Sequence, residues 1–186
     1  MCDHIFLVGM MGAGKTTVGR IVARRLGRPL LDSDAEVERT TGRTVPEIFA
    51  EQGEAAFRAE EKRALLEAAA STSPSVVAVA GGAVLDPDNR RLLRLSGTVV
   101  WLRARPATLA GRVRDGAGRP LLGGDPPGVL AALEVERRPL YASLADHVVD
   151  VDDRSRAEVA EQVLSAIHGT PAIAGRREER PAGAAG

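Results

Sequence analysis

The chain has 186 residues, balanced formal charge and 44% hydrophobic residues, which indicates a single domain that buries roughly 70% of its unfolded surface. Without a basic excess it is not expected to be a general nucleic-acid binder, and without an apolar run of about 18 residues it is not expected to span a membrane. Cys2 has no disulfide partner, no Cys/His cluster has zinc spacing and no signal peptide precedes the first apolar run, so a cytoplasmic location is expected.

Short apolar runs alternate with segments of helical periodicity along the chain. The predicted strands cover residues 5–8, 29–31, 75–80, 98–102 and 147–151. The predicted helices cover residues 15–26, 34–41, 46–70 with a candidate break at Gly53, 87–95, 106–114, 128–144 and 155–168. Because strands that alternate with helices pair in parallel, the sequence predicts an α/β fold.

Two segments lack the composition of packed elements. Residues 115–127 hold too many glycines and prolines for a helix or strand and are expected to form a mobile loop. Residues 169–186 are rich in Gly, Pro, Ala and Arg and are expected to be a disordered tail. The predicted folded domain therefore covers residues 1–168.

A glycine-rich motif follows the first predicted strand. Residues 9–16 read Gly-Met-Met-Gly-Ala-Gly-Lys-Thr and fit G-x-x-x-x-G-K-[ST]. The glycines let successive backbone N–H groups point at one phosphate, and the helix that begins directly afterwards adds its positive end. Lys15 can reach the outer phosphates and the Thr16 hydroxyl can bind Mg²⁺. The motif predicts nucleoside triphosphate binding without specifying the phosphate acceptor.

Two carboxylates follow the second predicted strand, at Asp32 and Asp34. In a parallel sheet, ligands bind beyond the carboxyl ends of the strands. One carboxylate could face Mg²⁺ through water, and the other could accept the proton of an acceptor hydroxyl. A helix N-cap at Ser33 or Asp34 explains the same pattern equally well.

On the long predicted helix, Arg58 and Glu61 are three residues apart and can pair, with Phe49 two turns earlier. This could be a carboxylate receptor with an aromatic wall. It could equally be a solvated charged face above core phenylalanines, and spacing alone favours that alternative.

Several arginines fall near predicted helix ends or in the glycine-rich loop. They are Arg112, Arg119, Arg137, Arg138 and Arg154. Arg119 lies in the predicted mobile loop, where it could close over a triphosphate and help to exclude water. Most surface arginines have no specific role, so none of these is assigned one by position alone.

Together these motifs resemble the shikimate kinases, over about residues 4–168. The resemblance rests on Gly-Met-Met-Gly-Ala-Gly-Lys-Thr-Thr at 9–17, Leu-Asp-Ser-Asp at 31–34, Thr-Gly-Arg-Thr-Val-Pro-Glu-Ile-Phe at 41–49, Phe-Arg-Ala-Glu-Glu at 57–61, Gly-Gly-Ala-Val at 81–84, Arg-Pro-Leu-Leu at 119–122 and Glu-Arg-Arg-Pro-Leu-Tyr at 136–141. Many kinases share the first motif, whereas the later ones in this order are much more specific.

The resemblance implies a three-layer P-loop kinase fold, with a five-stranded parallel sheet flanked by helices and a mobile lid at about residues 114–126. It also implies a cytoplasmic monomer, with Mg²⁺ as cofactor and ATP as co-substrate, that phosphorylates the 3-hydroxyl of shikimate in aromatic amino-acid biosynthesis. No nucleic-acid or membrane partner is expected. The alternatives are another small-metabolite kinase, such as a gluconate kinase, and a nucleotide-binding homologue that has lost catalysis.

For the nucleotide side, the resemblance implies that Lys15 contacts the transferring phosphate and that Arg119 reaches the phosphates from the lid. Thr16 is expected to bind Mg²⁺ directly, and Asp32 through water. Arg112 and Arg154 are expected to edge the adenine. The implied ATP-binding residues are Gly12, Ala13, Gly14, Lys15, Thr16, Thr17, Arg112, Arg119 and Arg154.

For the acceptor side, the resemblance implies that Asp34 binds the substrate hydroxyls and serves as the base. Arg58, oriented by Glu61, and Arg137 are expected to grip the carboxylate. The implied substrate-binding residues are Asp34, Phe49, Phe57, Arg58, Glu61, Gly81, Gly82 and Arg137, and the implied catalytic residues are Lys15, Asp34 and Arg119. Arg138 falls where the family shows no fixed function.

The chain departs from the family after the third predicted strand, where the family usually shows three glycines and this sequence reads Ala80-Gly81-Gly82. An alanine is tolerated there if its φ is negative. A positive φ would strain the backbone by about 1–3 kcal/mol. The departure bears on affinity more than on activity.

Overall fold

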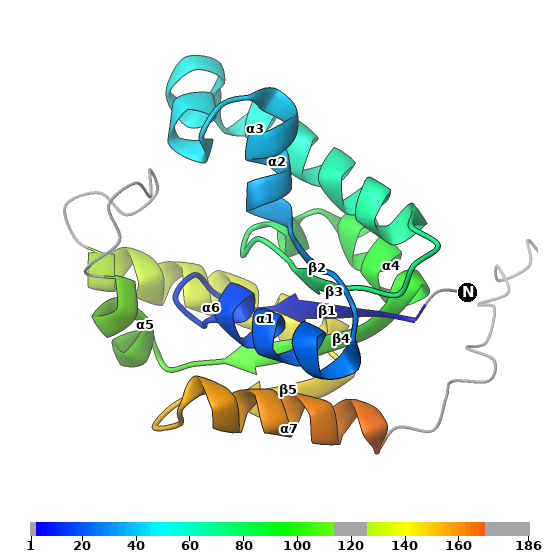
Figure 1. Ribbon diagram of the computed structural model, residues 1–186. Helices are drawn as coiled ribbons and strands as arrows, with labels where there is room; N and C mark the ends of the chain where they lie inside the picture. The colour runs from blue at the N-terminus through cyan, green and yellow to red at the C-terminus, as the bar shows by residue number, and fades with distance from the viewer. Residues whose placement is uncertain (1–2, 114–125, 170–186) are drawn as a thin grey trace, which may run out of the picture.

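The computed structural model describes residues 3–113 and 126–169 (Figure 1). The predicted lid, apart from its last residue, and the predicted tail, apart from Gly169, therefore lie outside the described residues, as does Arg119. No helix within the described ranges is both long and apolar enough to cross a membrane.

A five-stranded sheet forms the centre of the molecule, and every neighbouring pair of strands is parallel. The strands are β1 (His4–Val8), β2 (Leu30–Asp32), β3 (Val76–Ala78), β4 (Gly97–Arg103) and β5 (His147–Asp150), in the spatial order β2-β3-β1-β4-β5. Because β1 lies in the middle, the chain that leaves it emerges between the ends of β3 and β4. This is the crevice in which open α/β sheets bind ligands.

Helices cover both faces of this sheet (Figure 1). They are α1 (Lys15–Leu26), α2 (Ser33–Thr41), α3 (Val45–Ala70), the 3₁₀ turn η1 (Ala83–Leu85), α4 (Pro87–Ser96), α5 (Pro106–Val113), α6 (Pro126–Leu144) and α7 (Arg156–His168). Helices α1 and α7 pack together on one face, whereas α4 and α6 pack against β4 on the other. The predicted three-layer α/β fold is confirmed.

Local sequence signals explain where α3 begins and bends. Thr44 caps the helix in a capping box with Glu47, and Pro46 occupies the first turn, where its missing N–H costs nothing. Gly53 has φ 81° inside the helix, a left-handed conformation that a residue with a Cβ rarely adopts. The predicted break at Gly53 is confirmed, and it turns the first part of α3 toward α2.

Two predicted boundaries were wrong by two residues. Strand β3 ends at Ala78 rather than at residue 80, because the chain turns there and Ala83 N–H donates to Ala80 O. The 3₁₀ turn η1, which follows directly, was not predicted from the sequence. Helix α6 starts at Pro126, two residues early, since proline suits a first helical turn.

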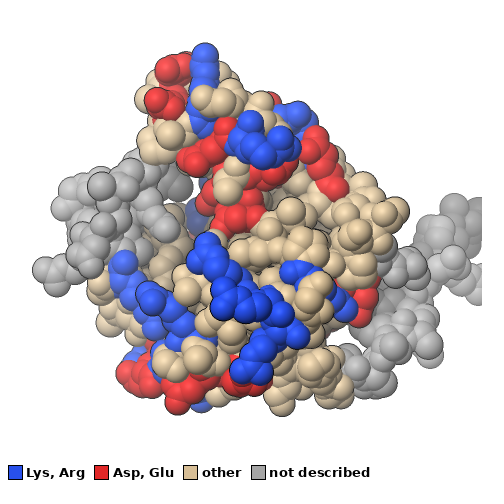
Figure 2. Space-filling view, in the orientation of Figure 1, with Lys and Arg blue, Asp and Glu red and all other residues tan. Residues whose placement is uncertain are grey.

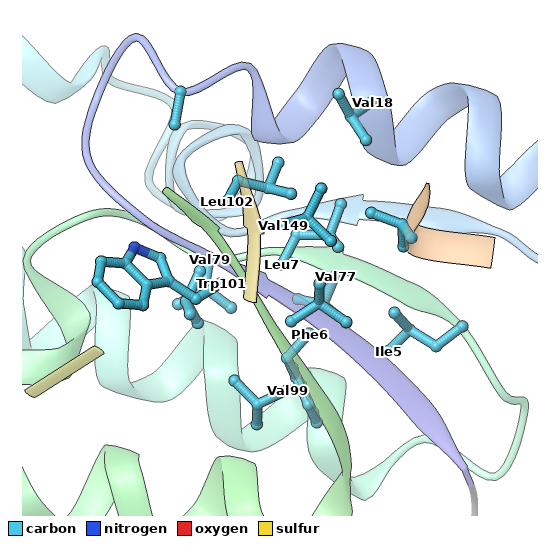
Figure 3. Close-up of a cluster of buried hydrophobic side chains, with 14 of the residues drawn as sticks. Ile5, Phe6, Leu7, Val18, Val77, Val79, Val99, Trp101, Leu102 and Val149 are labelled. Carbon is cyan, nitrogen blue, oxygen red and sulfur yellow. The ribbon is translucent and has the colours of Figure 1, made fainter. Parts of the chain in front are cut away.

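The hydrophobic core lies on both sides of β1, whose five residues are all buried (Figure 3). Phe6 and Leu7 are fully buried, and each such side chain contributes roughly 1.5–3 kcal/mol relative to exposure. A smaller cluster, Val37, Ile48, Phe57 and Ala64, joins α2 to α3. The main core fixes the loop after β1, and the smaller cluster fixes the opposite wall of the site.

Candidate active site

A cavity of about 440 Å³ opens at the carboxyl ends of the strands, between the loop after β1 and the α2–α3 pair. The predicted site residues that line it are Gly12, Ala13, Gly14, Lys15, Thr16, Asp32, Asp34, Phe49, Phe57, Arg58, Glu61, Gly81, Gly82, Arg112, Arg137 and Arg154. Thr17 lies on α1 outside this lining. Basic side chains gather over α1, below the hollow in Figure 2.

The loop from Gly9 to Gly14 curls around an anion-binding space. Gly9, Gly12 and Gly14 have φ values of 141°, 82° and 92°, which a Cβ would strain. At Gly9 a Cβ would also lie 2.5 Å from Leu102 O. Helix α1 begins directly after Gly14, so its unpaired N–H groups and positive dipole end face the same space. The geometry is that of a phosphate cradle.

The ammonium of Lys15 lies inside this curl. Its Nζ donates to Gly9 O at 2.8 Å and to Met10 O at 3.1 Å. A phosphate oxygen bound in the loop would compete with these carbonyls for the same donor, because a charged acceptor makes the stronger hydrogen bond.

Oxygen donors from two elements meet beside the loop. The Thr16 hydroxyl on α1 donates to Asp32 Oδ2 at 2.6 Å, and Asp32 Oδ1 accepts from Asp34 N–H at 3.1 Å. The capping residue of α2 is thus Asp32, so the proposed N-cap at Ser33 or Asp34 was wrong. Hydroxyl and carboxylate oxygens are the donor types that Mg²⁺ prefers, so this pair fits a magnesium ion that also binds substrate phosphates.

On the opposite wall, two carboxylates hold the Arg58 guanidinium. Its Nη1 donates to both oxygens of Glu61 at 3.0 Å, and its Nη2 donates to Glu54 at 2.9 Å. The Glu61 side chain is 1% exposed, so the alternative of a solvated charged face is wrong for this pair. The guanidinium is held in one orientation and still lines the cavity.

The electrostatic cost of this arrangement falls on Glu61. Burial raises the pKa of Glu61 to about 7, and the nearby Asp34 carboxylate adds to the rise, while Arg58 and Arg137 oppose it. A buried acid of this kind sits between two cations and one anion. Its protonation state therefore changes the net charge offered to a bound substrate.

Arg137 adds a second buried guanidinium to this wall. Its side chain is 3% exposed, and its Nε has no hydrogen-bond partner within the part of the chain that the structure describes. At Gly82 an added Cβ would overlap the Arg58 guanidinium, so only glycine leaves room for that group. Two guanidiniums and a bare stretch of backbone form a corner suited to a carboxylate.

Phe49 and Phe57 stand side by side beside this corner, with ring centroids 4.9 Å apart. Phe57 belongs to the smaller core cluster and Phe49 packs against it, yet both rings line the cavity. Core packing and substrate contact are therefore compatible roles for the pair.

The comparisons with known proteins agree with this geometry. The family model for shikimate kinase matches residues 11–168. The chain belongs to the shikimate kinase family. It is 48% identical to a shikimate kinase of Symbiobacterium thermophilum, over 88% of this chain and 95% of that protein. It is 49% identical to one of Cupriavidus pinatubonensis, over 87% and 84%. A solved shikimate kinase of Acinetobacter baumannii in complex with shikimate superposes with a TM-score of 0.87, at 39% identity, covering 90% of this chain and 94% of that one.

The structure accommodates Ala80, the residue at which the resemblance to the family implied a departure. Within the described ranges, Asp153 is the only residue other than glycine with a positive φ. The φ of Ala80 is therefore not positive, and its backbone carries none of the strain that a positive φ would cause. Its methyl group is buried, and its N–H donates to Ser33 Oγ at 2.9 Å. Ala80 therefore gives no structural reason to expect a loss of catalysis.

At the far end of the cavity, Arg112 and Arg154 are anchored on the segment around the end of β5. Arg112 donates to Val151 O at 3.2 Å, and Arg154 donates to Asp150 O at 2.6 Å. Arg156 also lines the cavity, together with Val151 and Val159. None of these three was among the predicted site residues. For Arg156 the reason is that nothing in the sequence separates it from the chain's many other arginines.

Three further residues escaped the sequence analysis. The spacing of Glu54, four residues before Arg58, could have revealed that ion pair. Tyr141 is the only tyrosine of the chain and lies one helical turn after Arg137, but no pattern shows that it reaches Gly81. The Ser33 hydroxyl meets Ala80 only in the folded sheet.

Proposed function

We propose that this chain transfers the terminal phosphate of ATP to the 3-hydroxyl of shikimate, giving shikimate 3-phosphate and ADP. The observation that carries the proposal is that a phosphate cradle and a corner with two guanidiniums face each other across one cavity. Shikimate is a carboxylate with several hydroxyls, and such a molecule needs an arginine fork at one end and a proton acceptor at the other.

As a member of a kinase family, the chain uses ATP as its co-substrate. Backbone N–H groups of residues 9–15 bind its phosphates, and Lys15 leaves Gly9 O and Met10 O to pair with them. Thr16 would hold Mg²⁺ directly and Asp32 would hold it through water. Bound there, Mg²⁺ neutralises charge on the phosphate oxygens. Arg112 and Arg154 pack along the adenine.

On the acceptor side, Arg58 and Arg137 bind the carboxylate, which presents the ring to Asp34. Asp34 accepts the proton of the 3-hydroxyl while the oxygen of that hydroxyl attacks the terminal phosphorus of ATP. The new O3–P bond forms while the bond from that phosphorus to the bridging oxygen breaks, and ADP leaves with the electron pair. Lys15 stabilises the charge that spreads over the transferring group.

An acceptor screen tests the proposal. ADP release is followed with Mg²⁺ and ATP alone, with shikimate and with gluconate, which also carries a carboxylate and hydroxyls. Shikimate alone should stimulate release strongly, and ³¹P NMR should find the phosphate on O3. Stimulation by gluconate and not by shikimate would assign another small-metabolite kinase. Tight ATP binding without turnover of either acceptor would indicate lost catalysis.

We further propose that the enzyme works as a monomer in the cytoplasm. One copy of the chain supplies both walls of the cavity, so the reaction needs no second subunit. Light scattering during gel filtration should give the mass of one chain at every concentration used for assay. A dimer mass under assay conditions would contradict the monomer.

A further inference from the structure

The loop that follows β3, residues 80–82, carries the backbone of the acceptor corner. We propose that two side-chain hydroxyls, those of Ser33 and Tyr141, hold this loop in its binding orientation, so that both are positioning residues for the acceptor. The inference rests on the proposed function, because the acceptor is the molecule whose binding the loop controls.

Ser33 extends the sheet beyond the point where β2 ends. Val76 N–H donates to Pro29 O at the start of the β2–β3 ladder. Four residues further along both strands, Ala80 N–H faces Ser33, but Ser33 already begins α2. Its buried hydroxyl accepts the hydrogen bond instead, at 2.9 Å. One side chain therefore ties the start of α2, which carries Asp34, to the start of the loop.

Tyr141 holds the loop from the other side. Its hydroxyl on α6 donates to Gly81 O at 2.6 Å, and its side chain is 1% exposed. The ring stacks on Trp101 of β4, with centroids 5.7 Å apart. Burial raises the pKa of Tyr141 above its ordinary value, against the opposing effect of Arg137, so the phenol keeps its proton and remains a donor.

These contacts leave two backbone N–H groups of the loop available to bind a ligand. Ala80 O accepts from Ala83 N–H, and Gly82 O accepts from Leu85 N–H. The N–H groups of Gly81 and Gly82 have no acceptor within residues 3–113 and 126–169, and both glycines line the cavity. The other polar groups of the loop thus hold it in place. This anchoring fixes the orientation of the Gly81 and Gly82 N–H groups at the cavity.

The loop also sets the place of Arg58, which lies against Gly82 so closely that a Cβ would overlap it. A tilt of residues 80–82 would therefore move two amides and one guanidinium together. The phosphate cradle is held mainly by β1 and α1, and it contacts these hydroxyls through the 4.0 Å approach of Tyr141 Oη to Met10 Sδ. Loss of either hydroxyl should weaken acceptor binding and leave nucleotide binding almost unchanged.

The alternative is that both hydroxyls only satisfy buried polar groups and contribute stability. Ser75 provides a matched control, because it is also a buried serine in a hydrogen bond, 2.8 Å from His4 Nδ1. His4 and Ser75 lie at the opposite end of the sheet from the cavity. S75A should lower the melting temperature without moving either Michaelis constant.

The experiment compares the S33A, S33T and Y141F variants of the full chain with S75A. S33A and Y141F should each raise the KM for shikimate about tenfold, because a buried group loses its partner, while the KM for ATP changes less than twofold. S33T keeps the hydroxyl and should restore the KM. Equal changes in both constants, or an unchanged KM for shikimate in S33A and Y141F, would overturn the proposal. Y141F keeps the stacked ring, so it carries the test if S33A does not fold.

Amide hydrogen exchange gives a readout that needs no turnover. The Ala80 amide should exchange faster in S33A and Y141F than in the parent chain, and at the parent rate in S75A. Exchange that stays at the parent rate in S33A and Y141F would overturn the positioning role. If the parent chain does not phosphorylate shikimate, the proposed function fails, and the exchange rates still decide whether the hydroxyls hold the loop.

Discussion

The two walls of the cavity are built in opposite ways. The nucleotide wall is one continuous segment, Gly9 to Thr16, whose backbone forms the proposed phosphate cradle and whose position a fully buried strand fixes. The acceptor wall consists of side chains from α2, α3 and α6 and of the backbone after β3, and ion pairs and hydrogen bonds among these groups hold them in place. A backbone site depends on glycines at fixed spacing, whereas a side-chain site depends on partners that are far apart in the sequence.

The largest expected effect removes the charge of the nucleotide wall. K15M should lower kcat about a thousandfold, because no other group in the loop supplies a cation to the transferring phosphate. The only other lysine, Lys62, pairs with Asp86 and Asp88 on the surface, so K62M is the matched control and should keep its rate. A kcat of K15M within tenfold of the parent value would show that the backbone N–H groups stabilise the transferring phosphate without the lysine.

The next test removes a charge from the acceptor wall. R58A should weaken shikimate binding by about 2–5 kcal/mol, because it takes away the carboxylate partner and leaves Glu61 buried without its cation. E54Q changes only the exposed partner of Arg58 and should move the KM for shikimate little. The contrast is measured by calorimetric titration with shikimate. An unchanged affinity in R58A would mean that the guanidinium does not touch the substrate.

The walls differ in how far the sequence reveals them. The spacing of residues 9–16 and the strand before them predicted the curled loop and the helix that follows it, because these parts are contiguous in the sequence. The acceptor wall could be predicted only from the family resemblance, since the spacing of Arg58 and Glu61 by itself favoured the alternative of a solvated charged face. The Ser33 and Tyr141 contacts could not be predicted, because each depends on where a helix comes to lie against the loop after β3.

The pH dependence of stability sharpens the comparison, because Glu61 belongs to the acceptor wall. Its pKa is about 7 when folded and 4.5 when unfolded, so unfolding between these values releases a proton, and rising pH favours the unfolded chain. From pH 5 to pH 8 the free energy of unfolding should fall by up to about 3 kcal/mol from this group. The loss should disappear in E61Q, measured by urea unfolding at each pH. A parent chain and E61Q with parallel pH profiles would contradict the burial of an ionisable carboxyl.

The smallest expected effect probes the contact of the loop with Arg58. G82A should raise the KM for shikimate about tenfold, because its Cβ displaces the flexible end of Arg58 and leaves the fold intact. G111A is the control, since Gly111 lies outside the cavity lining and a Cβ there would meet nothing within 4 Å. Equal KM values for the two variants would show that Arg58 has room to bind from another position.

A crystal structure with shikimate and a non-hydrolysable ATP analogue tests the two-wall account most directly. We expect the carboxylate to lie between Arg58 and Arg137, and the 3-hydroxyl to lie beside Asp34 and in line with the terminal phosphate. A shikimate carboxylate bound away from both arginines, or a 3-hydroxyl on the side of the ring remote from the phosphate, would contradict the proposed geometry.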